Sequence, residues 1–429
     1  MIKIYFKQAF RLLRENKLLS SISIIGTALA IAMIMVIVIT LRATIAPFSP
    51  EDYRDRMMIF KYAGLQHKVN ANWLMNGPLS YQTAKACFKE MPTPEAVSIV
   101  KVINETMLAS LPAGDKISCN ILQTDDAFWN VFNFNFIAGA PYTKADFDAE
   151  ATKAVVAEDV ARRLFGRTDV AGETFLLNNT LYIVSGVVSP VSKLSTYAYA
   201  QIWIPLSSTE DYTATWGAEN LMGSFSALIL ARSPDDFSKI RAEAEAMQRK
   251  YMESHPDWKL LYRGQPDSYF TAANRVSSMD PPSVKEAIRE YVVTLIILLI
   301  VPAVNLSGLT LSRMQKRISE VGVRKAFGAS RKELMMQILS ENMLYSILGG
   351  ILGLLLSFAA ILMFGQMFFS VDFASNGFVD MYSLFTHLLF DPLVFLLAFL
   401  SCFVLNLLSA LIPAWRITRV NVIDAINQK

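Results

Sequence analysis

The side chains that most often carry out chemistry are few in this sequence and stand far apart. Only three histidines occur, at His67, His255 and His387. A metal site draws clustered ligands, so histidines this scattered do not predict one. Neighbouring carboxylates, Asp125-Asp126 and Asp235-Asp236, are better explained as helix caps than as a facing acid–base pair. No G-x-x-x-x-G-K-[ST], H-E-x-x-H or G-x-S-x-G motif is present. We therefore predict no catalytic residues, no metal and no cofactor, and a chain that is not an enzyme.

A short basic segment followed by a long apolar one is the most pronounced chemical feature. Six cations crowd into this segment: Lys316, Arg317, Arg324, Lys325, Arg331 and Lys332. No further lysine or arginine follows until Arg416. Basic residues collect on the cytoplasmic side of membrane spans, so this sharp charge boundary predicts a membrane boundary with the basic side in the cytoplasm.

Local signals predict a short helix between the basic residues and the apolar run. Four apolar residues recur at helical spacing: Ile318, Val321, Val323 and Phe327. Gly328 suits the end of that helix, and Ser330 with Glu333 forms a capping box that starts a second helix. We expect this second helix to continue into the apolar run as a membrane span. The alternative is an ordinary basic loop that its charge holds in the cytoplasm.

The stretch SEVGVRKAFGASRKELMMQILSENMLYSILGGILGLLLS resembles the signature of the FtsX/MacB-type ABC transporter permeases. The family core E-[IV]-[GA]-[IV]-R-[KR]-A-x-G-A-[ST] extends here from Glu320 to Ser330. In that family this short helix is a coupling helix that docks on the ATP-binding subunit. The resemblance thus implies an ATPase-coupling role for nine residues: Glu320, Val321, Gly322, Val323, Arg324, Lys325, Ala326, Phe327 and Gly328.

Composition agrees with a membrane protein that has a large soluble part. Of 429 residues, 53% are hydrophobic and 18% charged, below the roughly 25% charged residues of a soluble domain. The net charge of +3 gives no indication of nucleic-acid binding. Cys402 falls in a predicted span, whereas Cys87 and Cys119 fall in the predicted external domain. A disulfide between those two is chemically possible, and two unpaired thiols are the other reading.

Apolar runs divide the chain into four predicted membrane helices, with a large α+β extracytoplasmic domain inserted between the first and the second. The run from Leu18 to Leu41 is long enough to cross a ~30 Å hydrocarbon core. Residues before it alternate basic and apolar, which predicts an amphipathic helix or, alternatively, the charged start of a signal peptide. The predicted order is an amphipathic cytoplasmic-face helix 1–17, first span 18–42, extracytoplasmic domain 43–285, second span 286–312, cytoplasmic loop with the coupling helix 313–333, third span 334–368, external loop 369–391, fourth span 392–413 and cytoplasmic tail 414–429.

The 43–285 region mixes strand and helix patterns, which is typical of an α+β domain. Predicted helices are Tyr81–Glu90 with Ser80 as N-cap, a turn at Asp125–Val131, Glu158–Phe165 ended by Gly166, and Asp235–Tyr251. Predicted strands are Val97–Leu108, Lys116–Gln123, Ala154–Ala157, Thr174–Asn178 and Thr180–Val188 as a hairpin, Ile202–Pro205 and Phe225–Ala231. The stretch FNFIAGAPYTKADF and its sequel KAVVAEDVARRLFGRTDVAGETFLLNNTLYIVSGVV are similar to the MacB-type periplasmic core domain, although the family's Gly-Arg is here Gly139-Ala140. Roughly residues 206–275 resemble no named part of the family, and we expect them to form the variable subdomain of its external domain.

Three residues of the predicted spans are candidates for helix packing. Pro302 predicts a kink, because proline removes one helical hydrogen bond. Gly349 and Gly353 form a G-x-x-x-G pair that lets helices approach closely, unless it provides only flexibility. Glu341 sits near the cytoplasmic end of the third span, either at the interface or buried with a function. The tail PAWRITRVNVIDAI resembles the family ending, with Val422 where proline is usual.

The resemblance implies a permease subunit that passes ATPase motion through the membrane to its external domain, for export or extraction of peptides, amphiphiles or lipoproteins. It implies four kinds of partner: a separate dimeric ATP-binding subunit, a second permease chain that is identical or related, membrane lipid, and a periplasmic adaptor or hydrolase. The implied location is the bacterial inner membrane, with both termini cytoplasmic. Two alternatives remain: an FtsX-like regulator of an extracytoplasmic cell-wall hydrolase, and a membrane-anchored sensor or structural protein without an ATPase partner.

Overall fold

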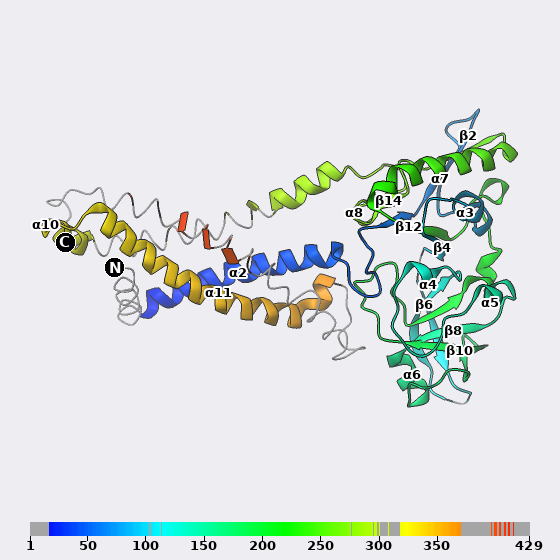
Figure 1. Cartoon of the computed structure of the whole chain (residues 1–429), viewed down its shortest axis with the longest axis horizontal. Coiled ribbons are helices and arrows are strands. Elements are labelled where there is room, and N and C mark those ends of the chain that lie inside the picture. Colours follow the sequence, from blue (N-terminus) through cyan, green and yellow to red (C-terminus); the bar gives the residue numbers. More distant parts are fainter. Residues whose placement is uncertain are drawn as a thin grey trace. The chain divides into compact units, whose positions relative to one another are not determined.

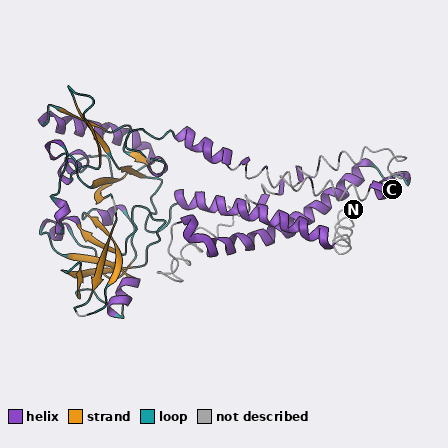
Figure 2. Cartoon of the chain, turned by 180° about the vertical axis from the view of Figure 1, so that it is seen from behind, coloured by secondary structure: helices purple, strands orange, loops and turns teal. Residues whose placement is uncertain are grey.

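The computed structural model describes residues 17–102, 104–112, 114–275, 277–294 and 318–369, with a few further positions at 296–297, 300, 308, 396, 399–400, 403–404, 407–408, 411 and 415. These residues form two compact units (Figure 1). One is Ala43–Ala287, which we call the sheet-rich unit; the other, the helical unit, contains the described residues outside that range. Figure 2 shows that the strands belong to the first and long helices to the second.

The main sheet of the sheet-rich unit runs in the order β11-β8-β10-β9-β5-β6-β4-β12-β1-β14, and β7 pairs with β10. Its strands are β1 (Met57–Phe60), β4 (Ala96–Lys101), β5 (Glu105–Ser110), β6 (Ile117–Thr124), β7 (Phe136–Gly139), β8 (Lys153–Ala157), β9 (Thr174–Leu177), β10 (Thr180–Val188), β11 (Ile202–Pro205), β12 (Phe225–Leu230) and β14 (Asp267–Ser268). Because β11 also pairs with β6, the segment from β11 to β6 closes on itself as a barrel. Closure removes the free edges from this part of the sheet.

Alternating burial explains the barrel. Along β10 the side chains of Tyr182 and Val184 are buried, while Leu181 and Ile183 between them are exposed. This two-residue period points one set of side chains into the barrel and the other outward. The interior set joins Phe175 and other apolar side chains of the barrel strands in one core cluster.

The remaining strands, β4, β12, β1 and β14, form an extension that is covered on both faces. The helices α3 (Tyr81–Phe88) and α7 (Phe237–Tyr251) contribute to one core cluster, and α4 (Phe128–Val131) and α8 (Tyr269–Ala273) to another. Every residue of β12 is buried. A strand covered on both faces has no solvent side, so its sequence FSALIL is almost continuously apolar.

Several predicted elements are confirmed. Ser80 caps α3 by accepting a hydrogen bond from the Thr83 N–H, and α6 (Glu158–Phe165) ends at Gly166, which has a φ of +72°. The predicted hairpin is β9–β10, with Asn178 and Asn179 at φ +45° and +69°. Two-residue turns with positive φ at both positions match the twist of the strands they join.

Three details of the prediction are wrong. Val97–Leu108 is not one strand but two, β4 and β5, because β4 pairs with β12 in the extension whereas β5 pairs with β6 and β9 in the barrel. The turn at Asp125–Val131 is helical only over Phe128–Val131. Asp125 caps no helix: its buried carboxylate accepts hydrogen bonds from Ser98 and the Ile99 N–H and pairs with Lys89 at 2.6 Å. Burial raises the pKa of this carboxyl, and Lys89 acts against that shift.

A separate three-stranded sheet has the order β13-β2-β3, with β2 (Ala63–His67), β3 (Leu74–Gly77) and β13 (Trp258–Leu261). None of its strands is among those predicted from the sequence. They are short, and β13 pairs with β2 across nearly 200 residues of chain, so no local pattern announces them. One side of β13 pairs with β2, and its other side is an edge of this sheet.

The helical unit contains α2 (Lys17–Ile45), α10 (Ile318–Ala326) and α11 (Arg331–Phe369). Within the described residues, one stretch, Arg331–Ala360 of α11, is both long and apolar enough to cross a membrane. A shorter apolar stretch, Ser20–Val36, lies in α2. The predicted helix 1–17, external loop 369–391 and tail 414–429 lie almost wholly outside the described residues, as do most of the second and fourth predicted spans.

Candidate functional site

The turn between α10 and α11 is built by local signals. Gly328 has a φ of +92°, a left-handed conformation that costs glycine little. Its N–H donates to the Lys325 carbonyl at 3.0 Å, and the Ala329 N–H donates to the Arg324 carbonyl at 3.0 Å. This pair of bonds is the Schellman motif, which satisfies carbonyls that a helix end otherwise leaves unbonded. Gly328 therefore ends α10 as the sequence predicts.

The start of α11 is capped from both directions. The Glu333 N–H donates to Ser330 Oγ at 3.3 Å, and the Ser330 N–H donates to Glu333 Oε2 at 2.9 Å. The predicted capping box is thus confirmed. These hydrogen bonds favour the ionised carboxylate and lower the pKa of Glu333. Both helix ends at this turn are therefore capped by residues of the turn itself.

An apolar side chain projects from this turn among cations. Phe327 is 88% exposed and Val323, one helical turn earlier, is 45% exposed. Arg324 Nη1 donates to Gln337 Oε1 of α11 at 2.6 Å, so α10 is tied to the next helix. Desolvation, and then the nearby Arg331, lower the pKa of Lys325. Large apolar side chains this exposed beside arginine are typical of protein contact sites.

The nine residues predicted for ATPase coupling are contiguous in the structure. Seven of them, Glu320 to Ala326, lie in α10; Phe327 and Gly328 follow in the turn. The side chains of Glu320 and Val321 lie outside the described part, as does the whole of Pro302. Arg324 and Phe327 are therefore the coupling candidates whose side-chain geometry can be argued most fully.

Gly349 and Gly353 lie against α2. A Cβ atom built on Gly349 would be 2.6 Å from Thr27 Cβ, and one on Gly353 would be 2.7 Å from the Ala28 carbonyl oxygen. No larger side chain fits either position without moving the backbone of α2. Small residues at this spacing let two helices approach closely, and in lipid such close packing replaces hydrophobic burial as the source of association.

A polar cluster joins the same two helices. The hydroxyls of Ser20 and Tyr345 are hydrogen-bonded at 3.1 Å, and Tyr345 OH donates to Glu341 Oε1 at 3.1 Å. Glu341 is only 2% exposed. Of the two sequence interpretations, the structure therefore places Glu341 in a buried position. The cluster links α2 to α11 by hydrogen bonds where the glycine pair links them by shape.

A buried ion pair follows directly after α2, in the sheet-rich unit. Arg54 Nε donates to Glu51 Oε2 at 2.7 Å, and both side chains are 0% exposed. The Arg54 guanidinium lies 4.1 Å from the ring centre of Phe48 and donates to the Ala46 carbonyl at 2.9 Å and the Leu194 carbonyl at 2.5 Å. The guanidinium is thus matched by a carboxylate, carbonyls and an aromatic face, as a buried cation requires.

Glu51 is satisfied just as fully. Its Oε1 accepts hydrogen bonds from the backbone N–H groups of Tyr197 at 2.7 Å and Ala198 at 2.9 Å. Its Oε2 accepts a further bond from Tyr269 OH of α8 at 2.8 Å. We call the set Phe48, Glu51, Arg54, Tyr197 and Tyr269 the root clamp. It ties the segment after α2 to the loop at Tyr197 and to α8, which is close to the C-terminal end of the sheet-rich unit's sequence.

A second buried ion pair lies in the C-terminal segment of the sheet-rich unit. Arg275 Nε and Nη2 donate to the two Asp267 oxygens at 2.5 and 3.0 Å, a bidentate pair almost without exposure. Lys61 Nζ donates to the Ala272 carbonyl of α8 at 2.6 Å. Burial is the largest influence on Lys61 and lowers its pKa. Buried charged groups therefore anchor both the N-terminal and the C-terminal segment of the sheet-rich unit in its core.

No local sequence pattern predicts the root clamp. The only signal was Glu51 and Arg54 three residues apart after an apolar run, which is common on protein surfaces. Tyr197 and Tyr269 stand 146 and 218 residues away from Glu51, and nothing local associates them with it.

Neither cysteine of the sheet-rich unit is in a disulfide. Cys87 and Cys119 are both buried and free, in different core clusters. Burial raises the pKa of Cys87 to about 11 and that of Cys119 to about 12. Across the described ranges, no group of three His, Cys, Asp or Glu side chains is placed to hold a metal ion.

Two family models match the chain. The MacB-like periplasmic core domain matches residues 20–247, more than half of the chain, and the FtsX-like permease C-terminal domain matches residues 292–422. With a MacB-like domain followed by an FtsX-like domain, the chain belongs to the MacB/FtsX-type family of ABC transporter permeases.

Individual relatives agree. The chain is 26% identical over 315 residues to the "Macrolide export ATP-binding/permease protein MacB 1" of Yersinia pestis bv. Antiqua (strain Antiqua), covering 72% of this chain and 43% of that protein. It is 23% identical over 236 residues to the "Uncharacterized ABC transporter permease YknZ" of Bacillus subtilis (strain 168), covering 54% of each. The chain therefore spans less than half the length of this MacB relative.

Two solved structures are similar at low identity. The periplasmic region of MacB from Actinobacillus actinomycetemcomitans has 14% identity and a TM-score of 0.33, covering 50% of this chain and 94% of that one. The extracellular domain of the YknZ transporter from Gram-positive bacteria has 14% identity and a TM-score of 0.33, covering 47% and 99%.

Proposed function

We propose that this permease takes up motion from a separate ATP-binding subunit at the turn between α10 and α11. The observation that carries the proposal is the 88% exposure of Phe327 on a turn whose helix ends are otherwise fully capped. An exposed phenylalanine is costly to leave in water, and a well-ordered turn presents it in one geometry. Arg324 and Lys325 supply cations for carboxylates of the partner.

The bond from Arg324 to Gln337 supports a mechanical role for this turn. If only the peptide backbone connected α10 to α11, a force on α10 would bend the turn and would not reach α11. Because Arg324 also ties α10 to α11, the push moves α11, a continuous helix of 39 residues. We propose that α11 crosses the membrane and carries this displacement, so that the chain acts as a transmitter of force.

We propose the following membrane arrangement. Four helices span the bacterial inner membrane, at 18–42, 286–312, 334–368 and 392–413, with both termini and the coupling helix in the cytoplasm. The sheet-rich unit then lies on the outer side. Family membership and the charge boundary beyond Lys332 support this arrangement.

The root clamp is suited to pass a displacement of α2 on to the sheet-rich unit. The segment after α2 is held in the core of the sheet-rich unit by the Glu51–Arg54 ion pair and by two cation–π contacts of Arg54. Glu51 also accepts hydrogen bonds from the backbone of the Tyr197 loop and from the Tyr269 hydroxyl. A soft attachment would absorb a displacement of α2, whereas a clamp passes it to the loop at Leu194 and to α8. We propose that the work done is export or extraction of peptides, amphiphiles or lipoproteins, by a pair of identical or related permease chains with a periplasmic adaptor as a further partner.

The coupling assignment is tested by replacing Arg324, Lys325 and Phe327 with Ala together and measuring capture of the co-expressed ATP-binding subunit. We expect capture and permease-stimulated ATP hydrolysis to fall at least tenfold. The matched control replaces an exposed arginine, lysine and leucine of the sheet-rich unit with Ala: Arg232, Lys116 and Leu181. Unchanged capture by the coupling variant would overturn the proposal.

A further inference from the structure

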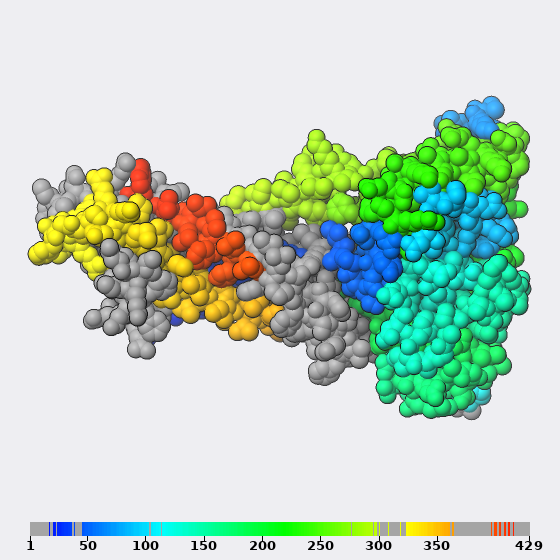
Figure 3. Space-filling model, in the orientation of Figure 1, coloured from blue at the N-terminus to red at the C-terminus, as the bar shows by residue number. Residues whose placement is uncertain are grey.

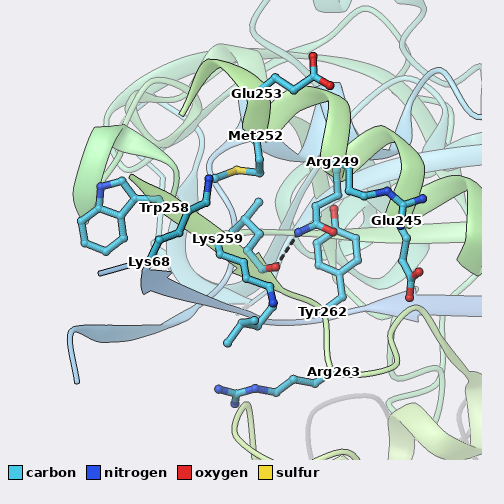
Figure 4. Close-up of a pocket in the computed structure, with 12 residues that line it drawn as sticks. Lys68, Glu245, Arg249, Met252, Glu253, Trp258, Lys259, Tyr262 and Arg263 are labelled. Atoms are coloured by element: carbon cyan, nitrogen blue, oxygen red, sulfur yellow. Dashed lines mark hydrogen bonds between the residues drawn. The ribbon is translucent and has the colours of Figure 1, made fainter. Parts of the chain in front are cut away.

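An open groove of about 730 Å³ lies between α7 and β13 of the small sheet (Figure 4). Its floor is apolar, formed by Met252, Leu260 and Tyr262, which are buried. Its size falls within the range of sites that take a peptide segment or a small molecule. None of its residues takes part in the coupling turn or the root clamp.

The two walls of the groove differ in charge. The sheet side carries Lys68, Lys259 and Arg263, whereas the α7 side carries Glu245 and Glu253 with Arg249 between them (Figure 4). In the described part of the chain, no carboxylate lies within ion-pair distance of the three cations on the sheet side. Lys68 and Lys259 are exposed. Lys68 and Lys259 are therefore available to an acidic partner, whereas Arg263 Nη1 donates to the Ser278 carbonyl.

The sheet wall is also an edge strand. Trp258 and Leu260 point into the core and Lys259 points outward, so β13 has the alternation of a regular strand. Its unpaired side faces the groove, where the Leu260 carbonyl accepts a hydrogen bond from Gln248 of α7 at 2.6 Å. The Leu260 carbonyl is therefore already bonded to α7, and an extended segment in the groove can pair only with the remaining edge groups of β13.

An exposed aromatic side chain lies beside the groove. Trp73, on the β2–β3 hairpin, is 54% exposed, and its ring lies 5.2 Å from that of Trp258 and 5.6 Å from that of His67. Val69 at the same hairpin is 89% exposed. Figure 3 shows this hairpin, in blue, projecting beyond the green surface of α7. A tryptophan held rigidly by aromatic neighbours while its outer part meets water is typical of binding hot spots.

We propose that this groove docks an extended, acidic segment of a partner protein in the same compartment, with Trp73 as the apolar anchor. The charge pattern favours a protein over an anionic membrane surface. Glu245 and Glu253 would repel a uniformly anionic sheet of lipid, and a concave groove meets a flat surface only at its rim. A peptide strand, in contrast, presents acidic side chains to Lys68 and Lys259 on one side only.

The test uses the full chain in zwitterionic nanodiscs and a fluorescein-labelled decapeptide of alternating Glu and Val, with the Lys–Val decapeptide for comparison. Binding is measured by fluorescence anisotropy at low salt. We expect the acidic peptide to bind and the basic one not. The double variant Lys68→Glu/Lys259→Glu should lower the affinity at least tenfold. Arg263 is left unchanged, because its φ of +51° and its hydrogen bond to the Ser278 carbonyl give it a structural role.

The matched control is Lys116→Glu/Lys239→Glu, which makes the same change in net charge at exposed lysines that do not line the groove. It should change affinity less than twofold, and Trp73→Ala should weaken binding several-fold while the charge is unchanged. Equal losses in the two double variants would overturn the proposal, as would binding of both peptides alike. It would also be overturned if phosphatidylglycerol vesicles, and not the acidic peptide, distinguished the groove variant from the control. ATP-binding protein capture by the groove variant should equal that of the parent, so the two proposals fail separately.

Discussion

Two regions of the molecule, the root clamp and the turn after α10, each place a phenylalanine beside an arginine next to a long helix. In the clamp, Phe48 is 5% exposed and lies 4.1 Å from the Arg54 guanidinium, whose charge is neutralised by Glu51. At the turn, Phe327 is 88% exposed, and Arg324 meets a neutral amide, Gln337. The same residue types are fully enclosed in one region and, for the phenylalanine, exposed to solvent in the other.

This difference shows which region is complete by itself. The charged groups of Glu51 and Arg54 have all their partners inside the sheet-rich unit, so the clamp holds its shape without a second protein. The turn has its backbone capped through Gly328 and the Ser330–Glu333 box and its Arg324 bonded to Gln337, but it leaves its apolar side chain outside. An exposed phenylalanine on so ordered a backbone is the basis of the proposal that a second protein binds at this turn.

The largest expected effect comes from breaking the clamp. Arg54→Met leaves the Glu51 carboxylate buried without its cation, which typically costs about 3–5 kcal/mol in free energy of unfolding. The loss is measured from the urea midpoint of the sheet-rich unit, followed by tryptophan fluorescence. The double variant Glu51→Gln/Arg54→Met removes both charges and should lose less. A loss below about 1 kcal/mol in the single variant would contradict the importance of the pair.

The next largest loss of stability is expected where Gly349 and Gly353 of α11 pack against α2. Gly353→Leu forces a side chain into the space next to the Ala28 carbonyl oxygen and Ile31 Cβ, and overpacking of this kind costs about 1–3 kcal/mol or more. We expect a lower thermal midpoint for the purified chain in detergent. Ala359→Leu, at an exposed position of the same helix, is the control. Equal midpoints in the two variants would show that this helix contact tolerates expansion.

The pH dependence of stability tests whether water reaches the buried Cys119 thiol in the core of the sheet-rich unit. Burial raises the pKa of the Cys119 thiol from 9.0 to about 12 in the folded state. Above pH 9 the unfolded chain therefore loses this proton first, and stability falls as pH rises, by at most about 1.4 kcal/mol per pH unit for one group. Cys119→Ala should lose less stability between pH 9 and 10 than the parent does in urea titrations. Identical slopes would mean that water reaches the thiol.

The smallest effect on stability is expected at the turn. Phe327→Ala removes a side chain that already meets solvent, so unfolding should change by less than about 0.5 kcal/mol, while ATP-binding protein capture falls. Phe48→Ala is the matched variant: it empties a buried site and should cost about 3–5 kcal/mol. Comparable destabilisation by the two substitutions would remove the contrast between the two regions.

Local signals made much of the helical turn predictable. Gly328, Ser330 and Glu333 lie within six residues, and each acts on the backbone of its neighbours, so their types and spacing were sufficient for the end of α10 and the start of α11. The same holds for α3 with Ser80 and for the Asn178-Asn179 hairpin. The small sheet was not predictable, because β13 has four residues and pairs with a strand far away in the chain.

The sequence by itself determined the family signature, the charge boundary beyond Lys332 and the caps of the short helices, since each depends on residues a few positions apart. Only the tertiary structure decided that Glu51 meets Tyr197 and Tyr269, that Asp125 braces β4 and not a helix end, and that Lys68 and Lys259 share one groove wall. A buried charge depends on partners that the fold brings together from distant segments, and the spacing of residues along the chain carries no record of them.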